Sequence, residues 1–249
     1  MKKTSVIILN WNGAELLKKF LPTVLIHTQS EDCEVVVADN ASSDNSVDVM
    51  KQHFPDVKLI LLDKNYGFAE GYNRALQQVD SKYVVLLNSD VETSPNWLSP
   101  LIEHLERNKN TAAVQPKILS YSNKSMFEYA GAAGGFIDRY GYPFCRGRIL
   151  HKLEEDKGQY DTPIEIFWAT GACLCMRRDD YMKAGGLDTE FFAHMEEIDL
   201  CWRLLARGKK IFCLPQSKVY HVGGASLDSE SPRKVYLNFR NNLLMIYKN

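Results

Sequence analysis

The sequence lacks several features that would point to common classes of protein. Its 249 residues contain no apolar run near the ~18–20 residues of a membrane-spanning helix. The 30 basic residues nearly cancel the 31 acidic ones, so the net charge of −1 does not favour a partner such as a nucleic acid. The six cysteines include no CxxC pair, which argues against a zinc site. These absences are consistent with an ordinary globular protein, in which 45% hydrophobic residues suffice for a sizeable core.

Two familiar nucleotide-binding loops are also absent. No GxGxxG follows the first apolar run, which disfavours a dinucleotide-binding Rossmann domain. Neither GxxxxGKS nor GxxxxGKT occurs, so the chain has no P-loop. A nucleotide would therefore have to bind through other groups, such as a metal ion held by a carboxylate.

The N-terminus combines two lysines with a short apolar run, as signal peptides do. Asn10 and Asn12 interrupt the run too early for a signal peptide, so we interpret residues 5–9 as a strand of the mature fold. Without a signal peptide, the thiols fit a reducing compartment, and we expect a cytoplasmic protein. Cys173 and Cys175 are expected to be small buried hydrophobes on one side of a strand.

The first half of the chain alternates between strand and helix patterns. Short apolar runs rich in β-branched residues predict strands at residues 5–9, 34–38, 57–62 and 83–87. Helical spacing of apolar residues predicts helices at residues 15–26, 46–54 and 68–78, the first of them despite Pro22. This alternation indicates an α/β fold, with a mostly parallel central sheet flanked by helices.

The second half is less regular. Its patterns predict helices at residues 96–107, 178–184, 196–206 and 234–247, and strands at residues 114–119, 164–176 and 210–214. Residues 120–161 show no clear periodicity, and we expect a mobile or acceptor-covering region there. Residues 220–226 are predicted to form a glycine-containing loop.

Small polar residues follow the four predicted strands of the first half. They are Asn10, Asp39, Asn65 with Gly67, and Asn88 with Asp90. Because the carboxyl ends of parallel strands meet at one edge of a sheet, these residues are expected to form one ligand-binding rim. Asp39 could accept a hydrogen bond from a nucleobase, whereas Asn65 and Gly67 could equally be turn residues only.

The segment Asn88-Ser89-Asp90 has two interpretations. A carboxylate at the end of a buried strand can hold a divalent cation, and the cation can hold a diphosphate. The simpler alternative is an Asx-type turn before a helix that starts near Pro95. His221 is the candidate second metal ligand, although a lone histidine is more often structural.

Three acidic residues, Glu196, Glu197 and Asp199, lie close together at the start of a predicted helix. The functional interpretation is a general base, a carboxylate that takes a proton from an attacking hydroxyl. The alternative is an acid cluster favourably placed in the first turn, with Asp199 and Arg203 forming an i,i+4 pair.

Taken in order, these segments resemble family 2 glycosyltransferases, and the rhamnosyltransferase-like branch is the most similar. The matching motifs are residues 6–13, 37–44, 65–69, 87–90, 185–188, 196–203 and 221–226. The resemblance implies a GT-A fold in a single domain over residues 1–249. It further implies a nucleotide-binding half at residues 1–110 and an acceptor and catalytic half at residues 111–249.

The resemblance implies an inverting transfer of a sugar from a nucleotide-sugar donor to a glycan or lipid-linked acceptor, in cell-surface polysaccharide or glycolipid synthesis. The implied donor contacts are Asn10, Asp39, Asn65, Gly67, Asn88 and Asp90. A divalent cation, Mn²⁺ or Mg²⁺, is expected at Asp90 and His221. Glu197 is the expected base with Glu196 as the alternative, and the implied acceptor-side residues are Trp168, Gly171 and Asp188.

The chain departs from the family pattern at two of these positions. Asn88 stands where the family has the first Asp of its DxD motif, so it adds no charge to the cation. Glu197 stands where the family has Asp, so the base would sit on a longer side chain. Two other classes stay open. One is a nucleotidyltransferase, whose glycine-rich loop is missing here, and the other is a non-catalytic binding module, against which the intact acidic residues argue.

The end of the chain suggests one more expectation. The last predicted helix reaches Asn249 without a capping residue. We therefore expect the native chain to continue into a segment that associates peripherally with the inner face of the membrane.

Overall fold

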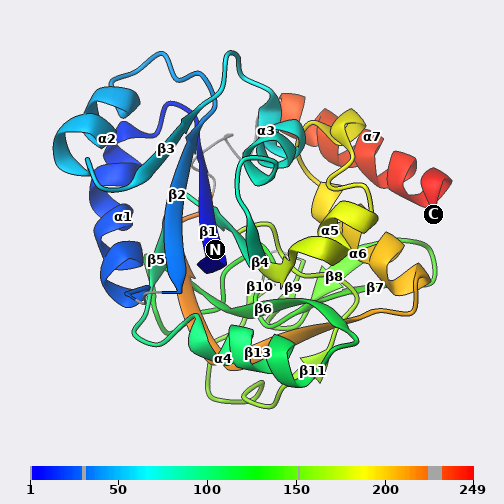
Figure 1. Ribbon diagram of the computed structural model, residues 1–249. Helices are drawn as coiled ribbons and strands as arrows, with labels where there is room; N and C mark the ends of the chain where they lie inside the picture. The colour runs from blue at the N-terminus through cyan, green and yellow to red at the C-terminus, as the bar shows by residue number, and fades with distance from the viewer. Residues whose placement is uncertain (1, 30–31, 151, 224–231) are drawn as a thin grey trace.

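The computed structural model describes residues 2–29, 32–150, 152–223 and 232–249 (Figure 1). A large sheet runs through the centre of the molecule. Its strands are β1 (Lys2–Asn10), β2 (Cys33–Asp39), β3 (Lys58–Leu61), β4 (Ser81–Asn88), β5 (Val91–Thr93), β6 (Thr111–Ser120), β11 (Ile164–Glu165), β12 (Cys173–Arg177) and β13 (Lys210–His221). The strand order is β11-β13-β6-β12-β4-β1-β2-β3, and β5 pairs with β13.

Most paired residues of the sheet belong to parallel ladders. Strands β4, β1, β2 and β3 are mutually parallel, as are β6 and β13. Strand β12 runs antiparallel to both β4 and β6, and it joins the two parallel groups. The predicted α/β fold with a mostly parallel sheet is confirmed. Strands of both predicted halves share this sheet, and the division of function between the halves stays a prediction.

Helices cover both faces of the sheet (Figure 1). One apolar cluster joins the sheet to α1 (Ala14–His27), α2 (Ser46–His53) and α4 (Ser99–Arg107). The other joins it to α3 (Gly67–Leu76), α5 (Arg178–Lys183), the short 3₁₀ helix η1 (Thr189–Phe191), α6 (Glu196–Ala206) and α7 (Pro232–Lys248). Val6 and Ile8 of β1 lie in the first cluster and Ile7 in the second, so the strand is apolar on both faces. None of the described helices is long and apolar enough to cross a bilayer.

Several elements predicted in the first half are confirmed. Helix α1 contains Pro22 within its length. The strands and helices up to β4 lie within a few residues of their predicted bounds. Cys173 and Cys175 are buried in the same cluster, as predicted for small hydrophobes.

The predicted strand at residues 164–176 is wrong, because the chain leaves the sheet between β11 and β12. Trp168 packs over Gly135 in an isolated bridge instead. The Thr170 N–H donates to Oε1 of Gln115 at 3.0 Å, so a side chain replaces a neighbouring strand as its partner. This excursion places Gly171 in a loop at the edge of the sheet.

Strand β13 is longer than the predicted strand at residues 210–214. Pro215 has no N–H to donate, and the register with β6 shifts between Leu214 and Lys218. Pairing then resumes as far as His221, which the predicted loop 220–226 had placed outside the sheet. Residues 224–226 of that loop lie outside the described residues. The helix predicted from residue 96 begins at Ser99.

The unassigned region at residues 120–161 contains a small antiparallel sheet. Its strands are β7 (Gly135–Ile137), β8 (Pro143–Cys145), β9 (Arg148–Ile149) and β10 (Lys152–Leu153). Lys117 of β6, which is fully buried, forms ion pairs with Asp156 and Asp161 and ties the region to the large sheet. The two carboxylates compensate the buried ammonium.

Candidate functional site

The predicted polar rim exists at the carboxyl ends of β1 and β2. Their parallel register sets Asn10 opposite Asp39, and Asn10 Nδ2 donates to Asp39 Oδ1 at 3.0 Å. Ser42 closes an Asx-type turn by donating its N–H to Asp39 Oδ2 at 2.9 Å and its hydroxyl to Oδ1 at 2.6 Å. The ring of Trp11 is 50% exposed beside this network. The rim therefore combines a buried, hydrogen-bonded carboxylate with an open aromatic surface.

Asn65 and Gly67 lie in the next loop of the rim, and their polar groups serve the turn. Asn65 Oδ1 accepts from the Gly67 N–H at 2.8 Å and from Asn40 Nδ2 at 3.1 Å. Gly67 has a φ of 72°, and a Cβ there would lie 2.6 Å from the ring of Phe192. Only glycine fits this position, which joins the rim to the segment before α6. These contacts agree with the interpretation of Asn65 and Gly67 as turn residues. A contact between them and the nucleotide-sugar donor stays a prediction.

Asp90 and His221 lie side by side because β5 pairs with β13. The antiparallel register sets His221 opposite Val91, the residue after Asp90. His221 Nε2 lies 3.1 Å from Asp90 Oδ1 and 3.4 Å from Asn88 Nδ2. Asp90 and His221 are each only 5% exposed. The sequence proposed this pair from two motifs that are far apart in the chain, and the fold brings them together.

A third buried side chain, Glu128, was not identified from the sequence. Its Oε2 atom lies 3.3 Å from His221 Nδ1, on the opposite side of the ring from Asp90, without forming a hydrogen bond. Glu128 lies in the region that showed no periodicity, so no sequence pattern indicated its place. Burial lowers the pKa of His221, but the adjacent carboxylates of Asp90 and Glu128 outweigh burial and raise the pKa to about 10. The imidazole thus stands in a strongly negative field.

These side chains fit a divalent cation that is shared with a ligand. Asp90 and His221 offer one oxygen and one nitrogen donor, a set that suits Mn²⁺ and related ions. Glu128 faces the other ring nitrogen, as carboxylates commonly do behind a metal-bound histidine. Among the described residues, no group of three or more His, Cys, Asp or Glu side chains is arranged to hold a metal. Remaining coordination positions would therefore come from a diphosphate or water.

The acid pair opens helix α6, and its two members differ in exposure. Glu196 is only 4% exposed, whereas Glu197 is half-buried. Glu197 Oε1 would lie 3.8 Å from a Cβ at Gly171, in the loop before β12. The Asn88 N–H donates to the carbonyl of Ala172, the next residue, at 3.1 Å. Glu197 and Asn88 are therefore joined through one short loop, which brings the acid pair toward the end of β4.

Burial raises the pKa of both carboxyl groups of the pair. For Glu196 the charge of Glu197 adds to the effect of burial, and the pKa is raised well above its usual value. For Glu197 backbone hydrogen bonds, including one with Gly171, oppose the effect of burial. The Oε2 atoms of both residues have no hydrogen-bond partner in the structure. A carboxylate with a raised pKa and a free oxygen can accept a proton from a substrate.

The third acidic residue, Asp199, has a structural role. It forms the predicted i,i+4 ion pair with Arg203 at 2.7 Å. Arg203 in turn donates to the carbonyl of Gly186 at 2.8 Å, so the pair ties α6 to the turn after α5. Its other oxygen, Oδ1, accepts from Asn249 Nδ2 at 2.8 Å, so both carboxylate oxygens of Asp199 have partners.

The backbone before α6 is held in an unfavourable conformation. Phe192, His194 and Met195 have φ values of 64°, 72° and 74°. Holding a residue other than glycine in the left-handed region costs on the order of 1–3 kcal/mol. Met195 occupies the N-cap position of α6 and makes no side-chain cap. Strain of this kind persists only where surrounding contacts hold it, and here it directly precedes the acid pair.

Trp168 and Asp188, two of the predicted acceptor-side residues, have structural partners. Trp168 is 5% exposed, and its indole N–H donates to the Phe136 carbonyl at 2.8 Å. Asp188 caps η1 by accepting from the Glu190 N–H at 3.0 Å, and it pairs with Lys248. Gly171, the third, lies beside Glu197. An acceptor-side role of these residues stays a prediction.

A comparison with known protein families decides which family this is. The family described as Glycosyl transferase family 2 matches residues 5–184. The chain belongs to glycosyltransferase family 2. The match covers both the rim at the ends of β1 and β2 and the segment Asn88 to Asp90. The resemblance drawn from the seven sequence motifs is thereby confirmed.

Relatives of this family 2 chain include two rhamnosyltransferases. The N-acetylglucosaminyl-diphospho-decaprenol L-rhamnosyltransferase of Mycobacterium tuberculosis is 25% identical over 232 residues, which are 87% of this chain and 75% of that protein. Rhamnosyltransferase WbbL of Escherichia coli K12 is 24% identical, over 87% of this chain and 82% of that protein. The O-antigen biosynthesis protein RfbC of Myxococcus xanthus is 27% identical over 90% of this chain, which spans only 18% of RfbC.

Solved structures agree with the GT-A fold implied by the motifs. GalNAc-T7, solved with UDP, GalNAc and Mn²⁺, superposes with a TM-score of 0.74 at 18% identity, over 99% of this chain and 48% of that one. The mannosyltransferase PcManGT of Pyrobaculum calidifontis, solved with GDP-Man and Mn²⁺, gives a TM-score of 0.63 at 18% identity, over 90% of this chain and 58% of that one. At these identities the similarity establishes the fold alone.

Proposed function

We propose that this family 2 chain is an inverting glycosyltransferase. It moves a sugar from a nucleotide-sugar donor to an acceptor hydroxyl in the synthesis of a cell-surface polysaccharide or glycolipid. The observation that carries the proposal is the placement of Glu197 relative to the buried Asp90–His221 pair. Both sets of groups adjoin one short loop: Glu197 lies beside Gly171, and Asn88, next to Asp90 and His221, donates its N–H to the Ala172 carbonyl. A leaving-group site and a proton acceptor are thus within reach of one donor.

The proposed reaction is a single displacement. The acceptor oxygen forms a bond to the anomeric carbon as the bond from that carbon to the diphosphate oxygen breaks. The electron pair of the breaking bond leaves with the nucleoside diphosphate, and Glu197 takes the proton of the acceptor hydroxyl. Attack opposite to the leaving group inverts the anomeric configuration. Asp90 and His221 would hold the cation, which when bound stabilises the negative charge of the diphosphate. The Mn²⁺ in both solved relatives supports this ligand class.

The test of the proposal is donor turnover with a panel of nucleotide sugars. UDP-, dTDP- and GDP-linked sugars are incubated with the protein, with Mn²⁺, with Mg²⁺ or with EDTA, and the released nucleoside diphosphate is measured. Water serves as the acceptor in this assay. We expect metal-dependent release from at least one donor. Formation of a nucleoside triphosphate and a sugar 1-phosphate when pyrophosphate is added would indicate a nucleotidyltransferase, and binding of a donor without any turnover would indicate a non-catalytic module.

Replacing Glu128 by Gln is expected to weaken Mn²⁺ binding about 10–100-fold, the usual effect of losing a carboxylate behind a metal-bound histidine. Glutamine has the same size as glutamate but lacks the negative charge that favours the metal-bound form of His221. Titration of Mn²⁺ by electron paramagnetic resonance, with UDP, dTDP or GDP present, measures the change. Glu155→Gln, a surface residue of the same region that pairs with Lys157, is the matched control. Equal Mn²⁺ affinity in both variants would show that Glu128 does not support metal binding.

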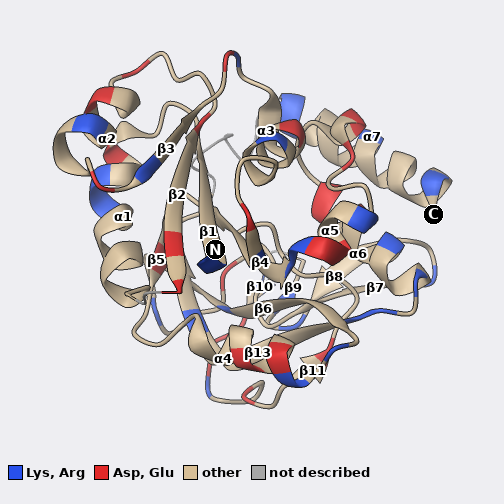
Figure 2. Ribbon diagram, viewed as in Figure 1, with Lys and Arg blue, Asp and Glu red and all other residues tan. Residues whose placement is uncertain are grey.

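A lipid-linked acceptor is proposed from the relative named for a diphospho-decaprenol substrate. The surface of α7 supports it. Four side chains at helical spacing, Tyr236, Phe239, Leu243 and Tyr247, are between 62% and 89% exposed. The helix carries Lys and Arg residues and no acidic residue (Figure 2). An apolar, aromatic and basic helix face is typical of proteins that lie on an anionic bilayer.

The α7 surface is tested with vesicles that contain phosphatidylglycerol. We expect the wild-type protein to cosediment with them, and less so at high salt. The double variant Phe239→Glu, Leu243→Glu should lose about tenfold or more of this binding, because it puts charge into the apolar face. Ile26→Glu is the control, since Ile26 is 61% exposed on α1, across the sheet. Equal binding by the double variant and the control would contradict the proposed surface.

A further inference from the structure

Helix α7 does more than present an exposed face, because its buried side holds the strained segment before the acid pair. Asn241 is fully buried. Its Nδ2 atom lies 2.9 Å from the carbonyl oxygen of Phe191, 2.8 Å from that of Ala193 and 2.7 Å from that of His194. The amide has two hydrogens, so these three carbonyls share them. One side chain thus gathers the carbonyls around two of the left-handed residues.

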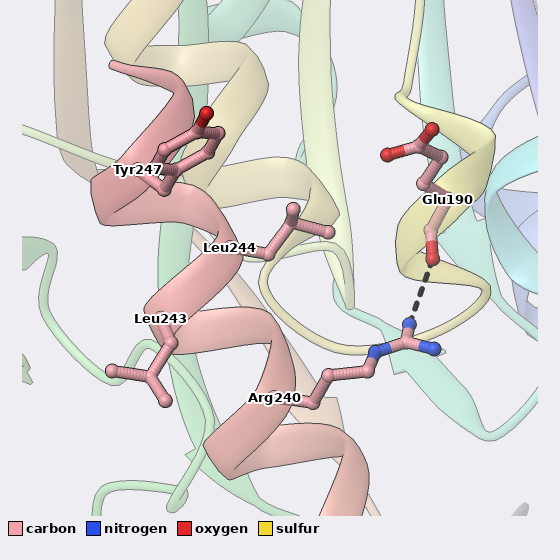
Figure 3. A pocket seen from close by; sticks show the side chains of 5 residues that line it. All are labelled: Glu190, Arg240, Leu243, Leu244 and Tyr247. Atoms are coloured by element: carbon pink, nitrogen blue, oxygen red, sulfur yellow. Dashed lines mark hydrogen bonds between the residues drawn. The ribbon is translucent and has the colours of Figure 1, made fainter.

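Arg240 extends the same contact. Its Nη2 atom donates to the Glu190 carbonyl at 2.7 Å, the bond drawn in Figure 3, and to the Phe191 carbonyl at 3.0 Å. Its Nε atom donates to Asn241 Oδ1 at 2.8 Å, which fixes the direction of the Asn241 amide. An open pocket of about 560 Å³ lies beside these residues, but its lining contains no carboxylate or imidazole of the site described above. The role of α7 here is therefore contact with the backbone.

The remaining carbonyl of the segment, that of Phe192, bonds to α3 and not to α7. The Phe192 carbonyl accepts from the N–H groups of Phe68 and Ala69 at 2.9 and 3.3 Å, at the start of α3. All carbonyls from Glu190 to His194 thus accept a hydrogen bond from α7 or α3. The segment is clamped between these helices, and α6 begins two residues after His194 with Glu196 and Glu197.

We propose that Asn241 is a positioning residue for the catalytic carboxylate. It acts through the backbone of residues 191–194, where it holds Phe192 and His194 in the left-handed region and so sets the direction of the first turn of α6. The inference rests on the proposed role of Glu197 as the base. Loss of the clamp lets the segment relax and moves Glu197 away from the acceptor, while Asp90 and His221, which the pairing of β5 with β13 holds together, stay in place.

The test compares Asn241→Ala with Asn242→Ala, whose side chain bonds instead to the Gly141 carbonyl. We expect Asn241→Ala to lower kcat for donor turnover about 10–100-fold, with the affinity for UDP, dTDP or GDP in Mn²⁺ changed less than about twofold. Amide hydrogen exchange should rise at residues 191–197 in this variant only. Asn242→Ala should match the wild type in all three measurements.

The result that overturns the inference is unchanged kcat and exchange in Asn241→Ala, or an equal fall in kcat in both variants. If Asn241→Ala does not fold, Asn241→Gln decides, because it keeps the amide but moves it by one methylene. A fall in kcat with unchanged nucleotide affinity supports the clamp, and wild-type kcat refutes it. Glu197→Gln separates the two proposals. If Glu197→Gln keeps full turnover, the proposed base is wrong. If Glu197→Gln loses turnover and Asn241→Ala keeps it, the base is supported and only the positioning role of Asn241 is refuted.

Discussion

Replacing Glu197 by Gln is expected to lower the turnover of the donor about 10²–10⁴-fold, the range that a positioned general base contributes. Glutamine has the same shape but cannot accept the acceptor proton. The affinity for the nucleoside diphosphate should stay within about twofold, because Glu197 lies beside Gly171 and has no contact with Asp90 or His221 in the structure. Steady-state release of nucleoside diphosphate and titration calorimetry measure the two quantities.

The pH dependence provides a second signature of the same residue. The base acts in its deprotonated form, and burial raises the pKa of Glu197, so turnover should fall at a higher pH than for an exposed glutamate. Glu196→Gln should leave this limb of the profile nearly unmoved and keep most of the turnover, because burial, and not the charge of Glu196, raises the pKa of Glu197. If Glu196→Gln abolishes turnover and Glu197→Gln does not, the base has been assigned one residue too late.

Replacing Asp90 by Ala is expected to abolish the metal dependence of nucleotide binding. In the wild type, affinity for the correct nucleoside diphosphate should be much higher with Mn²⁺ than with EDTA. Asp90→Ala should show the low affinity in both conditions and a turnover reduced on the order of 10²–10³-fold, because the charge on the leaving diphosphate is no longer compensated. His221→Ala should act in the same direction, since the two side chains lie 3.1 Å apart.

The matched control for Asp90 is Glu92→Gln. Glu92 is on β5, two residues further along, and forms an ion pair with Lys124 at the surface. We expect wild-type binding and turnover from it. A loss of nucleotide affinity in Asp90→Ala that is the same with Mn²⁺ and with EDTA would contradict a metal-holding role. Asp90 would then serve the structure of the turn, where its carboxylate accepts from the Gly223 N–H at 3.3 Å.

The regular part of the fold could be predicted from the sequence because each strand from β1 to β4 is apolar on both faces and ends at small polar residues. Periodicity failed where a local contact replaced the sheet ladder. The Gln115 side chain accepts a hydrogen bond from the Thr170 N–H, which interrupts the strand predicted at residues 164–176. At Pro215 a shift of register, which no pattern of hydrophobic residues reveals, lets β13 continue to His221.

The site divides in the same way. Asp90 and His221 belong to motifs, so the resemblance indicated them, and the pairing of β5 with β13 explains their contact. Glu128 and Asn241 belong to no motif used in the sequence analysis. Each acts through a contact between segments distant in the chain, one with an imidazole and the other with three backbone carbonyls. Such a role depends on the packed structure, and single-sequence patterns carry no signal for it.

The most direct test of the account is a crystal structure after soaking with Mn²⁺ and, in turn, UDP-, dTDP- and GDP-linked sugars. We predict a metal ion bound to Asp90 and His221, the diphosphate on that metal ion, and the anomeric carbon facing Glu197 past Gly171. Anomalous scattering identifies the Mn²⁺ position independently of the nucleotide. A nucleotide sugar bound away from Asp90 and His221, or with its anomeric carbon turned away from Glu197, would contradict the central claim.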